Sequence, residues 1–122
     1  SEVVTSEKTL SSGTPTANVT TVVANSGTDN VSFNLNATDD QGLKNVTIVL
    51  KERQSNNKNS EFQQVGSKQV VNLSAKSVNE QKTVNFPNVD IKSNNREYRV
   101  EVRVYDDNGN ASPLIEKDAT VQ

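Results

Sequence analysis

The feature that most constrains this chain is an alternation of apolar and polar residues that twice ends in a similar acidic turn. Every second residue is apolar in the segments 31–37 and 98–104, which is the period of a strand with one buried face. The first segment is followed by Asp39-Asp40-Gln41-Gly42, and the second by Asp106-Asp107-Asn108-Gly109-Asn110. Because aspartate, asparagine and glycine favour tight turns, the pattern predicts antiparallel strands joined by short connections.

The rest of the chain continues this pattern to seven or eight strands. We expect them at 17–24, 31–38, around 46–50, at 62–65, 68–73, 81–86, 97–105 and 114–121, with a polar loop at 53–61. Several short strands at this spacing are typical of an antiparallel β-sandwich, an all-β fold. The side chains expected to point inward are Phe33, Leu35, Ile48, Leu50, Phe86, Tyr98, Val100, Val102 and Val104.

A chain of 122 residues has the length of one domain. Residues 1–14 are rich in serine, threonine and glutamate and end beside Gly13 and Pro15, so we interpret them as a linker. The sandwich is expected to span residues 15–122. The chain starts at Ser1 and contains no methionine, from which we expect it to be a piece of a longer protein.

The composition argues against most enzymatic functions. The chain has no cysteine and no histidine, so the usual general base, the Ser-His and Cys-His nucleophile pairs and thiolate metal sites are excluded. A hydrolase that uses two carboxylates is chemically conceivable, but a small sandwich leaves little room for its cleft, and we expect no enzymatic activity. The net charge of −2 predicts no binding to nucleic acid or to anionic membranes, and no apolar run is long enough for membrane insertion.

The two acidic turns form the first candidate site. The two strands that precede them should run in the same direction, so the turns should meet at one pole of the sandwich. Carboxylate and amide oxygens on flexible loops are the ligands that Ca²⁺ prefers. The candidate ligands are Asp39, Asp40, Asp106, Asp107, Asn108 and Asn110. The alternative is that these side chains only hydrogen-bond to the backbone of their own turns, in which case the domain needs no cofactor.

The outward face of the strand 97–105 forms the second candidate site. Arg99 and Arg103 alternate with Glu97 and Glu101 on this strand, and Tyr105 ends it. An arginine fork can pair with the carboxylate of a sugar or peptide, and a tyrosine ring offers a stacking surface. Arg99, Arg103 and Tyr105 are therefore the candidate ligand-binding residues. The alternative is a solvated face whose charges pair with one another across strands.

The same two segments resemble a known group of modules. The sequence V-x-F-x-L-x-A-T-D-D-x-G-L-x-x-V-x-I-x-L at 31–50, together with Y-x-V-x-V-x-V-x-D-x-x-G-N-x-S at 98–112, is similar to bacterial immunoglobulin-like and fibronectin-III-like modules of Gram-positive cell-surface adhesins. The resemblance covers about residues 15–122. It implies an extracellular location, at the cell surface or in the cell wall, and neighbouring domains in the same chain.

The resemblance leaves three functions open. The first is adhesion, in which the module binds a host glycan or surface protein, or presents a neighbouring domain that does so. The second is a structural spacer repeat without a ligand. The third is an accessory module of a secreted carbohydrate-active enzyme. Modules with this fold serve all three functions, so the resemblance does not decide between them.

Overall fold

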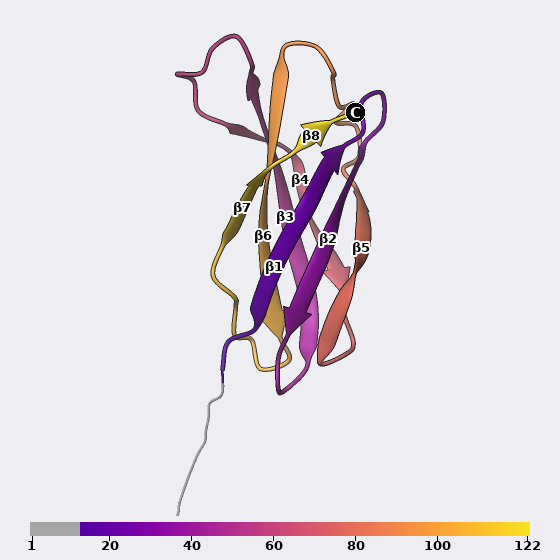
Figure 1. The fold of residues 1–122 in the computed structure, drawn as a ribbon, viewed down its shortest axis with the longest axis vertical. Coiled ribbons are helices and arrows are strands. Elements are labelled where there is room, and N and C mark those ends of the chain that lie inside the picture. Colours follow the sequence, from indigo (N-terminus) through magenta and orange to yellow (C-terminus); the bar gives the residue numbers. More distant parts are fainter. Residues whose placement is uncertain (1–12) are drawn as a thin grey trace, which may run out of the picture.

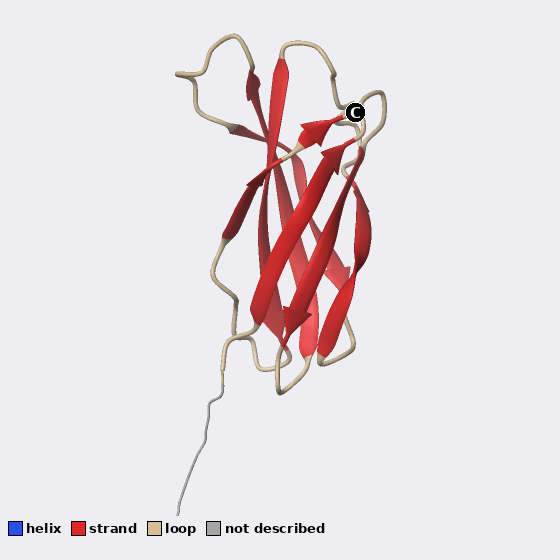
Figure 2. Cartoon of the chain, viewed as in Figure 1, coloured by secondary structure: helices blue, strands red, loops and turns tan. Residues whose placement is uncertain are grey.

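A computed structural model describes residues 13–122, which form eight strands and no helix (Figures 1 and 2). The strands are β1 (Thr16–Ala24), β2 (Asn30–Thr38), β3 (Leu43–Gln54), β4 (Gln63–Asn72), β5 (Ser77–Asn85), β6 (Arg96–Asp106), β7 (Ile115–Asp118) and β8 (Thr120–Val121). One sheet has the order β5-β2-β1-β8 and the other has the order β4-β3-β6-β7. The expected all-β sandwich of seven to eight strands is therefore confirmed.

The two sheets pack face to face with antiparallel neighbours throughout, apart from the parallel pair β1–β8. The connections β2–β3, β4–β5 and β6–β7 lie at one end of the long axis, which we call the lower pole (Figure 1). The connections β1–β2, β3–β4 and β5–β6 lie at the other end, the upper pole. The strand β6, which carries one candidate site, lies between β3 and β7 as a central strand.

The core confirms the strand faces that the alternation predicts. On β2, Val31, Phe33, Leu35 and Ala37 are all buried, whereas the residues between them are partly or fully exposed. All nine residues of the expected inward set are at most 1% exposed. Along each of these strands the buried residues alternate with polar ones. The polar residues therefore lie on the two outer faces of the sandwich.

Tyr98 supports a corner of the sandwich at the start of β6. Its ring is buried, and its hydroxyl oxygen accepts a hydrogen bond of 2.9 Å from the backbone N–H of Lys92. Burial raises the pKa of Tyr98 to about 12. The neutral hydroxyl therefore holds the β5–β6 connection against the start of β6 at any physiological pH.

The prediction of two short strands at 62–65 and 68–73 was wrong. The chain forms the single strand β4, whose pairing with β3 shifts register between Ile48 and Leu50. Gly66 lies in this region with a φ of +70°, a conformation that glycine adopts without strain. A β-bulge therefore keeps one strand continuous at a point where the sequence indicates a break.

The prediction of one last strand at 114–121 was also wrong. β7 pairs with β6 in one sheet, while β8 pairs with β1 in the other sheet. Ala119 lies between the two strands, and its N–H donates a 2.9 Å hydrogen bond to the carbonyl oxygen of Tyr98. The chain crosses between the sheets at this residue, so the two halves of the segment belong to different layers.

Two strand boundaries differ from expectation in smaller ways. The strand expected at 81–86 begins earlier, at Ser77, and β3 continues to Gln54, so the polar loop is 55–62 rather than 53–61. Most of the expected linker 1–14 lies outside the described residues. Its division from the domain at residue 15 stays a prediction.

Candidate functional site

The two acidic turns meet at the lower pole, as their position in the chain predicts. The backbone N–H of Asp107 donates a 3.0 Å hydrogen bond to the carbonyl oxygen of Gly42. Gly42 has a φ of +116°, and a Cβ atom at this position would lie 2.6 Å from Oδ2 of Asp107. The turns are therefore in direct contact, and the contact depends on the missing side chain of this glycine.

The two buried carboxylates in these turns organise the backbone around them. Oδ2 of Asp39 accepts hydrogen bonds from the N–H groups of Gln41 at 2.8 Å and Gly42 at 3.1 Å. Oδ1 of Asp106 accepts from the N–H groups of Asn108 at 2.9 Å and Asn110 at 2.8 Å, and its Oδ2 accepts from Nδ2 of Asn110 at 3.1 Å. These are the turn contacts that the alternative to a calcium site predicts.

The two carboxyl groups differ in acidity because their surroundings differ. Burial, together with the negative charge of Asp106, raises the pKa of Asp39 above its usual range. Burial also acts to raise the pKa of Asp106, but the hydrogen bonds from Asn110 and Asn108 outweigh it and lower that pKa. Asp39 is thus the first of the pair to take up a proton in acid.

The other four candidate calcium ligands are exposed: Asp40, Asp107, Asn108 and Asn110. Within residues 13–122, no group of three or more acidic, histidine or cysteine side chains is arranged to hold a metal ion. Oδ1 of Asp39 is the one buried carboxylate oxygen of the two turns without a hydrogen-bond partner among the described residues. The described residues thus show the turn contacts of the alternative, and calcium binding at this pole is untested.

The second candidate site lies on the outer face of the sheet β4-β3-β6-β7, where most charges pair internally. Nε of Arg53 lies 2.8 Å from Glu97, and Nζ of Lys51 lies 2.8 Å from Glu101. Lys58 also pairs with Glu97. These contacts lower the pKa of both glutamates. In the upper half of this face the charges therefore neutralise one another across strands. This is the arrangement expected of a solvated face that binds no ligand.

Arg99 belongs to this network rather than to an open site. Its Nε lies 2.8 Å from Oδ1 of Asp118 on β7, a contact that raises the pKa of the guanidinium. Its guanidinium carbon also lies 4.2 Å from the ring centre of Phe62, whose ring centre lies 4.4 Å from the guanidinium carbon of Arg53. The sequence did not reveal this aromatic contact, because Phe62 follows a polar loop with no apolar alternation.

Arg103 differs from the other arginines of the chain. Arg53, Arg96 and Arg99 each pair with a carboxylate, whereas Arg103 forms no ion pair with any residue in the range 13–122. Its Nε is buried and lacks a hydrogen-bond partner in that range. A buried donor without a partner costs about 1–3 kcal/mol, and no acceptor among the described residues offsets that cost at Arg103.

Apolar side chains flank Arg103 in the sheet. Thr47 pairs with Val70 on one side and with Arg103 on the other. Leu114 directly precedes Ile115, the first residue of β7 and the partner of Val102, and so lies just beyond the end of the β6–β7 pairing. Val70 is 55% exposed and Leu114 is 47% exposed, and they are the exposed large hydrophobic residues among those described. A cross-strand row therefore contains Val70, Thr47 and Arg103, and Leu114 lies near its end.

Tyr105 extends this surface toward the lower pole. It is half-buried and pairs with Asn45 on β3, whose Oδ1 is buried without a hydrogen-bond partner in the described part of the chain. We call the surface formed by these residues the Arg103 patch: Asn45, Thr47, Val70, Arg103, Tyr105 and Leu114. The structure thus brings together two of the three expected ligand-binding residues and commits the third, Arg99, to internal contacts.

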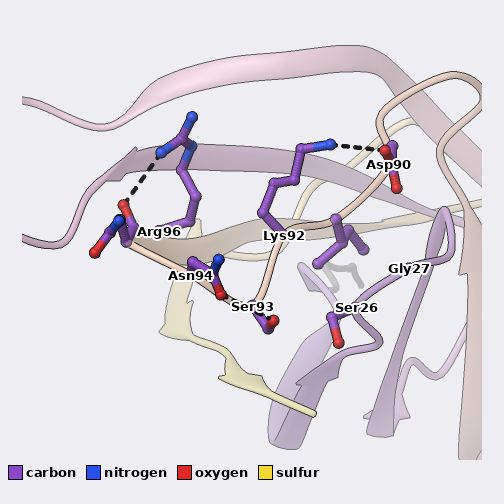
Figure 3. A pocket seen from close by; sticks show the side chains of 9 residues that line it. Ser26, Gly27, Asp90, Lys92, Ser93, Asn94 and Arg96 are labelled. Carbon is purple, nitrogen blue, oxygen red and sulfur yellow. Dashed lines mark hydrogen bonds and ion pairs between the residues drawn. The ribbon is translucent and has the colours of Figure 1, made fainter.

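A polar cleft of about 590 Å³ lies at the upper pole (Figure 3). It is lined by the β1–β2 turn and by the β5–β6 connection, including Ser26, Asp90, Lys92 and Arg96. Nζ of Lys92 lies 2.7 Å from Asp90, and a terminal nitrogen of Arg96 donates to the carbonyl oxygen of Asn95. Because both cations contact their own loop, this cleft presents no free charge of the kind found at Arg103.

Residues 13–122 contain no helix with the length and hydrophobicity that a bilayer crossing requires.

Known proteins offer a likeness of fold only. No family model matches this chain, and no curated protein sequence matches it. Among solved structures, the chain is similar to part of OgpA from Akkermansia muciniphila, with a TM-score of 0.56 and 18% identity over 87% of this chain and 27% of OgpA. The catalytically inactive OgpA in complex with an O-glycopeptide substrate gives a TM-score of 0.51 and 18% identity, with 87% of this chain and 28% of OgpA covered.

The chain thus spans about a quarter of the OgpA chain that it matches. A weaker likeness is to the third fibronectin III domain of the human KIAA0343 protein, with a TM-score of 0.42 and 16% identity over 86% of this chain and 80% of that domain. At these identities the comparisons concern the fold, and the site must be argued from its own residues.

Proposed function

We propose that this chain is a non-catalytic adhesion module of an extracellular bacterial surface protein, and that it binds a carboxylate-bearing host ligand through the Arg103 patch. The observation that carries the proposal is the guanidinium of Arg103, which has no acceptor within residues 13–122 and lies on the same sheet as the exposed Val70, two strands away, and near the exposed Leu114. Arginine, tyrosine and uncovered aliphatic groups are the combination that protein-binding surfaces use.

The carboxylate follows from the chemistry of the patch. A planar guanidinium binds a carboxylate through two parallel hydrogen bonds. In the free module Glu101, the acidic neighbour of Arg103 on its strand, does not occupy its guanidinium, because Glu101 pairs with Lys51. A ligand carboxylate would supply the missing acceptor, and an apolar part of the ligand would cover Val70 and Leu114.

The positions of the chain ends support a role as one module in a row. β1 begins at the lower pole, and the end marked C lies at the upper pole (Figure 1). The N–H of Gln122 donates a 2.9 Å hydrogen bond to the carbonyl oxygen of Ala24, the last residue of β1. The chain therefore enters and leaves at opposite ends of the long axis, as a module strung between neighbouring domains would require.

One observation favours a second candidate, an accessory module of a secreted carbohydrate-active enzyme. OgpA, which has been crystallised with an O-glycopeptide substrate, contains a region of similar fold within a longer chain. Under this second function the module would position a neighbouring domain on glycosylated material. The presence of a neighbouring catalytic domain in the full-length gene would favour it over adhesion.

The proposal is tested by the binding of the labelled module to cultured mammalian cells. Wild type is compared with Arg103→Glu and with the control Lys68→Glu, which makes the same change of charge at an exposed position on the same sheet. We expect Arg103→Glu to abolish binding and Lys68→Glu to preserve it. Loss of binding after sialidase treatment of the cells would assign the carboxylate to a sialylated glycan, and loss after protease treatment to a protein. Equal binding by wild type and Arg103→Glu would contradict the proposal.

A further inference from the structure

The outer face of the other sheet is uncharged over most of its width. β1 and β2 contain no charged residue. Their outward side chains continue onto β5 in cross-strand rows, of which two lie in the middle: Asn18–Asn36–Asn79 and Thr20–Asn34–Gln81. All six side chains are exposed. This face is therefore a regular array of carboxamides and hydroxyls.

The two faces of the sandwich differ in kind. The sheet β4-β3-β6-β7 carries lysines, arginines and glutamates that pair across its strands. On the sheet β5-β2-β1-β8, the strands β5, β2 and β1 carry only Glu80 and Lys82 as charges, at the open edge of β5, and these two lie 3.5 Å from each other. Charged residues make up 23% of the chain, so their absence from two adjacent nine-residue strands is a local property of this face.

The carboxamides of the array are free to bind. Within the described part of the chain, none of the six side chains in the two rows forms a side-chain hydrogen bond, in contrast to the neighbouring pairs Thr16–Thr38 and Asn30–Asn85. The six side chains, together with Glu80, line a groove of about 350 Å³ that crosses β1, β2 and β5. Each carboxamide offers two donors and an acceptor at the surface of this groove.

We propose that this face binds a neutral, hydroxyl-rich polysaccharide chain. Sugar hydroxyls donate and accept hydrogen bonds at once, as carboxamides do, and six of the seven residues that line the groove are uncharged, Glu80 being the exception. The rows repeat at about 4.8 Å across the strands and about 6.8 Å along them, a spacing comparable with the size of a sugar ring. A second copy of the module is a poor occupant, because stable protein interfaces need an apolar centre, and Val70 and Leu114 lie on the opposite sheet.

The polysaccharide face is independent of the Arg103 patch. The two surfaces lie on different sheets, with the core of the sandwich between them. One recognises a carboxylate and the other an uncharged chain. A module with both surfaces would bind a host ligand on one sheet and a neutral glycan on the other. The polysaccharide proposal therefore does not depend on carboxylate binding at the Arg103 patch.

The test follows the side-chain NH₂ signals of the 122-residue chain by ¹⁵N–¹H NMR. The probes are soluble neutral oligosaccharides of glucose, galactose and N-acetylglucosamine, with a sialylated oligosaccharide as the charged comparison. We expect one neutral probe to shift the NH₂ signals of Asn34, Asn36 and Gln81 in a saturable manner. The signal of Asn72, which is exposed on β4, should stay in place. The absence of such shifts with every neutral probe would overturn the proposal.

A matched pair of variants localises the binding. Asn36→Asp replaces donors in the middle of the array with a charge, and we expect it to weaken the affinity about tenfold. Asn72→Asp makes the same change on the opposite sheet and should leave the affinity as it is. Equal affinity of Asn36→Asp and wild type would overturn the proposal, as would a concentration-dependent dimer of wild type that Asn36→Asp dissociates, because the face would then be an interface between copies.

Discussion

At the scale of single residues, the acidic pole shows how two aspartates of similar sequence context come to have opposite properties. Asp106 receives three hydrogen bonds from the turn that follows it, whereas Asp39 receives two on one oxygen and none on the other among the described residues. Burial acts to raise both pKa values, and the hydrogen bonds outweigh it only at Asp106, so the pKa of Asp39 is raised and that of Asp106 is lowered. Substitution of each by asparagine, which has the same shape, should therefore change stability in opposite directions.

We predict that Asp39→Asn stabilises the domain at neutral pH. The raised pKa of Asp39 means that the folded state favours the protonated carboxyl, so its contribution to stability is present in acid and is lost as the pH rises through the folded pKa. The amide keeps an oxygen for the backbone and carries no charge. Thermal unfolding should show a higher Tm for the variant at pH 7 and a smaller difference at pH 3. A lower Tm at pH 7 would show that the burial of the Asp39 charge, together with repulsion from Asp106, is not the dominant effect.

We predict that Asp106→Asn destabilises the domain by about 1–3 kcal/mol at pH 7, because the amide nitrogen would face Nδ2 of Asn110 and leave donors without an acceptor. The lowered pKa of Asp106 gives stability that is present above its ordinary value of 3.8 and is lost as the pH falls below it. Urea unfolding at several pH values should therefore show the deficit of the variant shrink in acid. A constant deficit at all pH values would point to packing rather than charge.

At the scale of strands and turns, the close contact of the two lower turns depends on Gly42. Alanine there would carry a Cβ at a φ of +116° and 2.6 Å from the carboxylate of Asp107. We expect Gly42→Ala to cost about 1–3 kcal/mol of stability. Gly27→Ala is the matched control, since its φ of +76° is also positive but no atom lies within 4 Å of the added Cβ. Equal costs for the two alanines would show that φ alone, and not the contact, decides the effect.

The sequence predicts those elements that have one buried face. β2, β3 and β6 alternate cleanly because the core covers one side of each, so their inward residues follow from the period alone. β4 has few buried residues and continues through Gly66 by a bulge, and the segment 114–121 changes sheets at Ala119. Neither the bulge nor the change of sheet can be predicted from the local sequence, because each depends on pairing with a neighbouring strand.

For the Arg103 patch, too, the sequence predicts the features that depend on alternation along one strand and not those that depend on neighbouring strands. The outward direction of Arg103 and Tyr105 follows from alternation along β6. The lack of an acceptor and the proximity of Val70 and Leu114 depend on cross-strand register, which the bulge in β4 shifts. The pairing of Arg99 with Asp118 could not be predicted from the sequence for a related reason, since it depends on the division of the segment 114–121 into β7 and β8.

At the scale of the whole molecule, the described residues have two outer faces of contrasting chemistry and one acidic pole. We predict that millimolar Ca²⁺ leaves the Tm of the module unchanged, because three of the four oxygens of Asp39 and Asp106 accept hydrogen bonds within their own turns. Calorimetry with and without the ion checks this. A rise in Tm that Asp39→Asn together with Asp106→Asn abolishes would establish calcium at this pole.

The central claim is that the guanidinium of Arg103 binds a carboxylate of an external ligand. The most direct measurement is the ¹⁵Nε–¹H NMR signal of each arginine, of which the chain has four, during titration with a sialylated trisaccharide and, separately, with a glutamate-containing peptide that has apolar neighbours. We predict that one of these probes shifts the signal of Arg103 in a saturable manner. The signal of Arg99, held by Asp118, should not move. A shift of Arg99 without Arg103, or no shift of Arg103 with either probe, would contradict the claim.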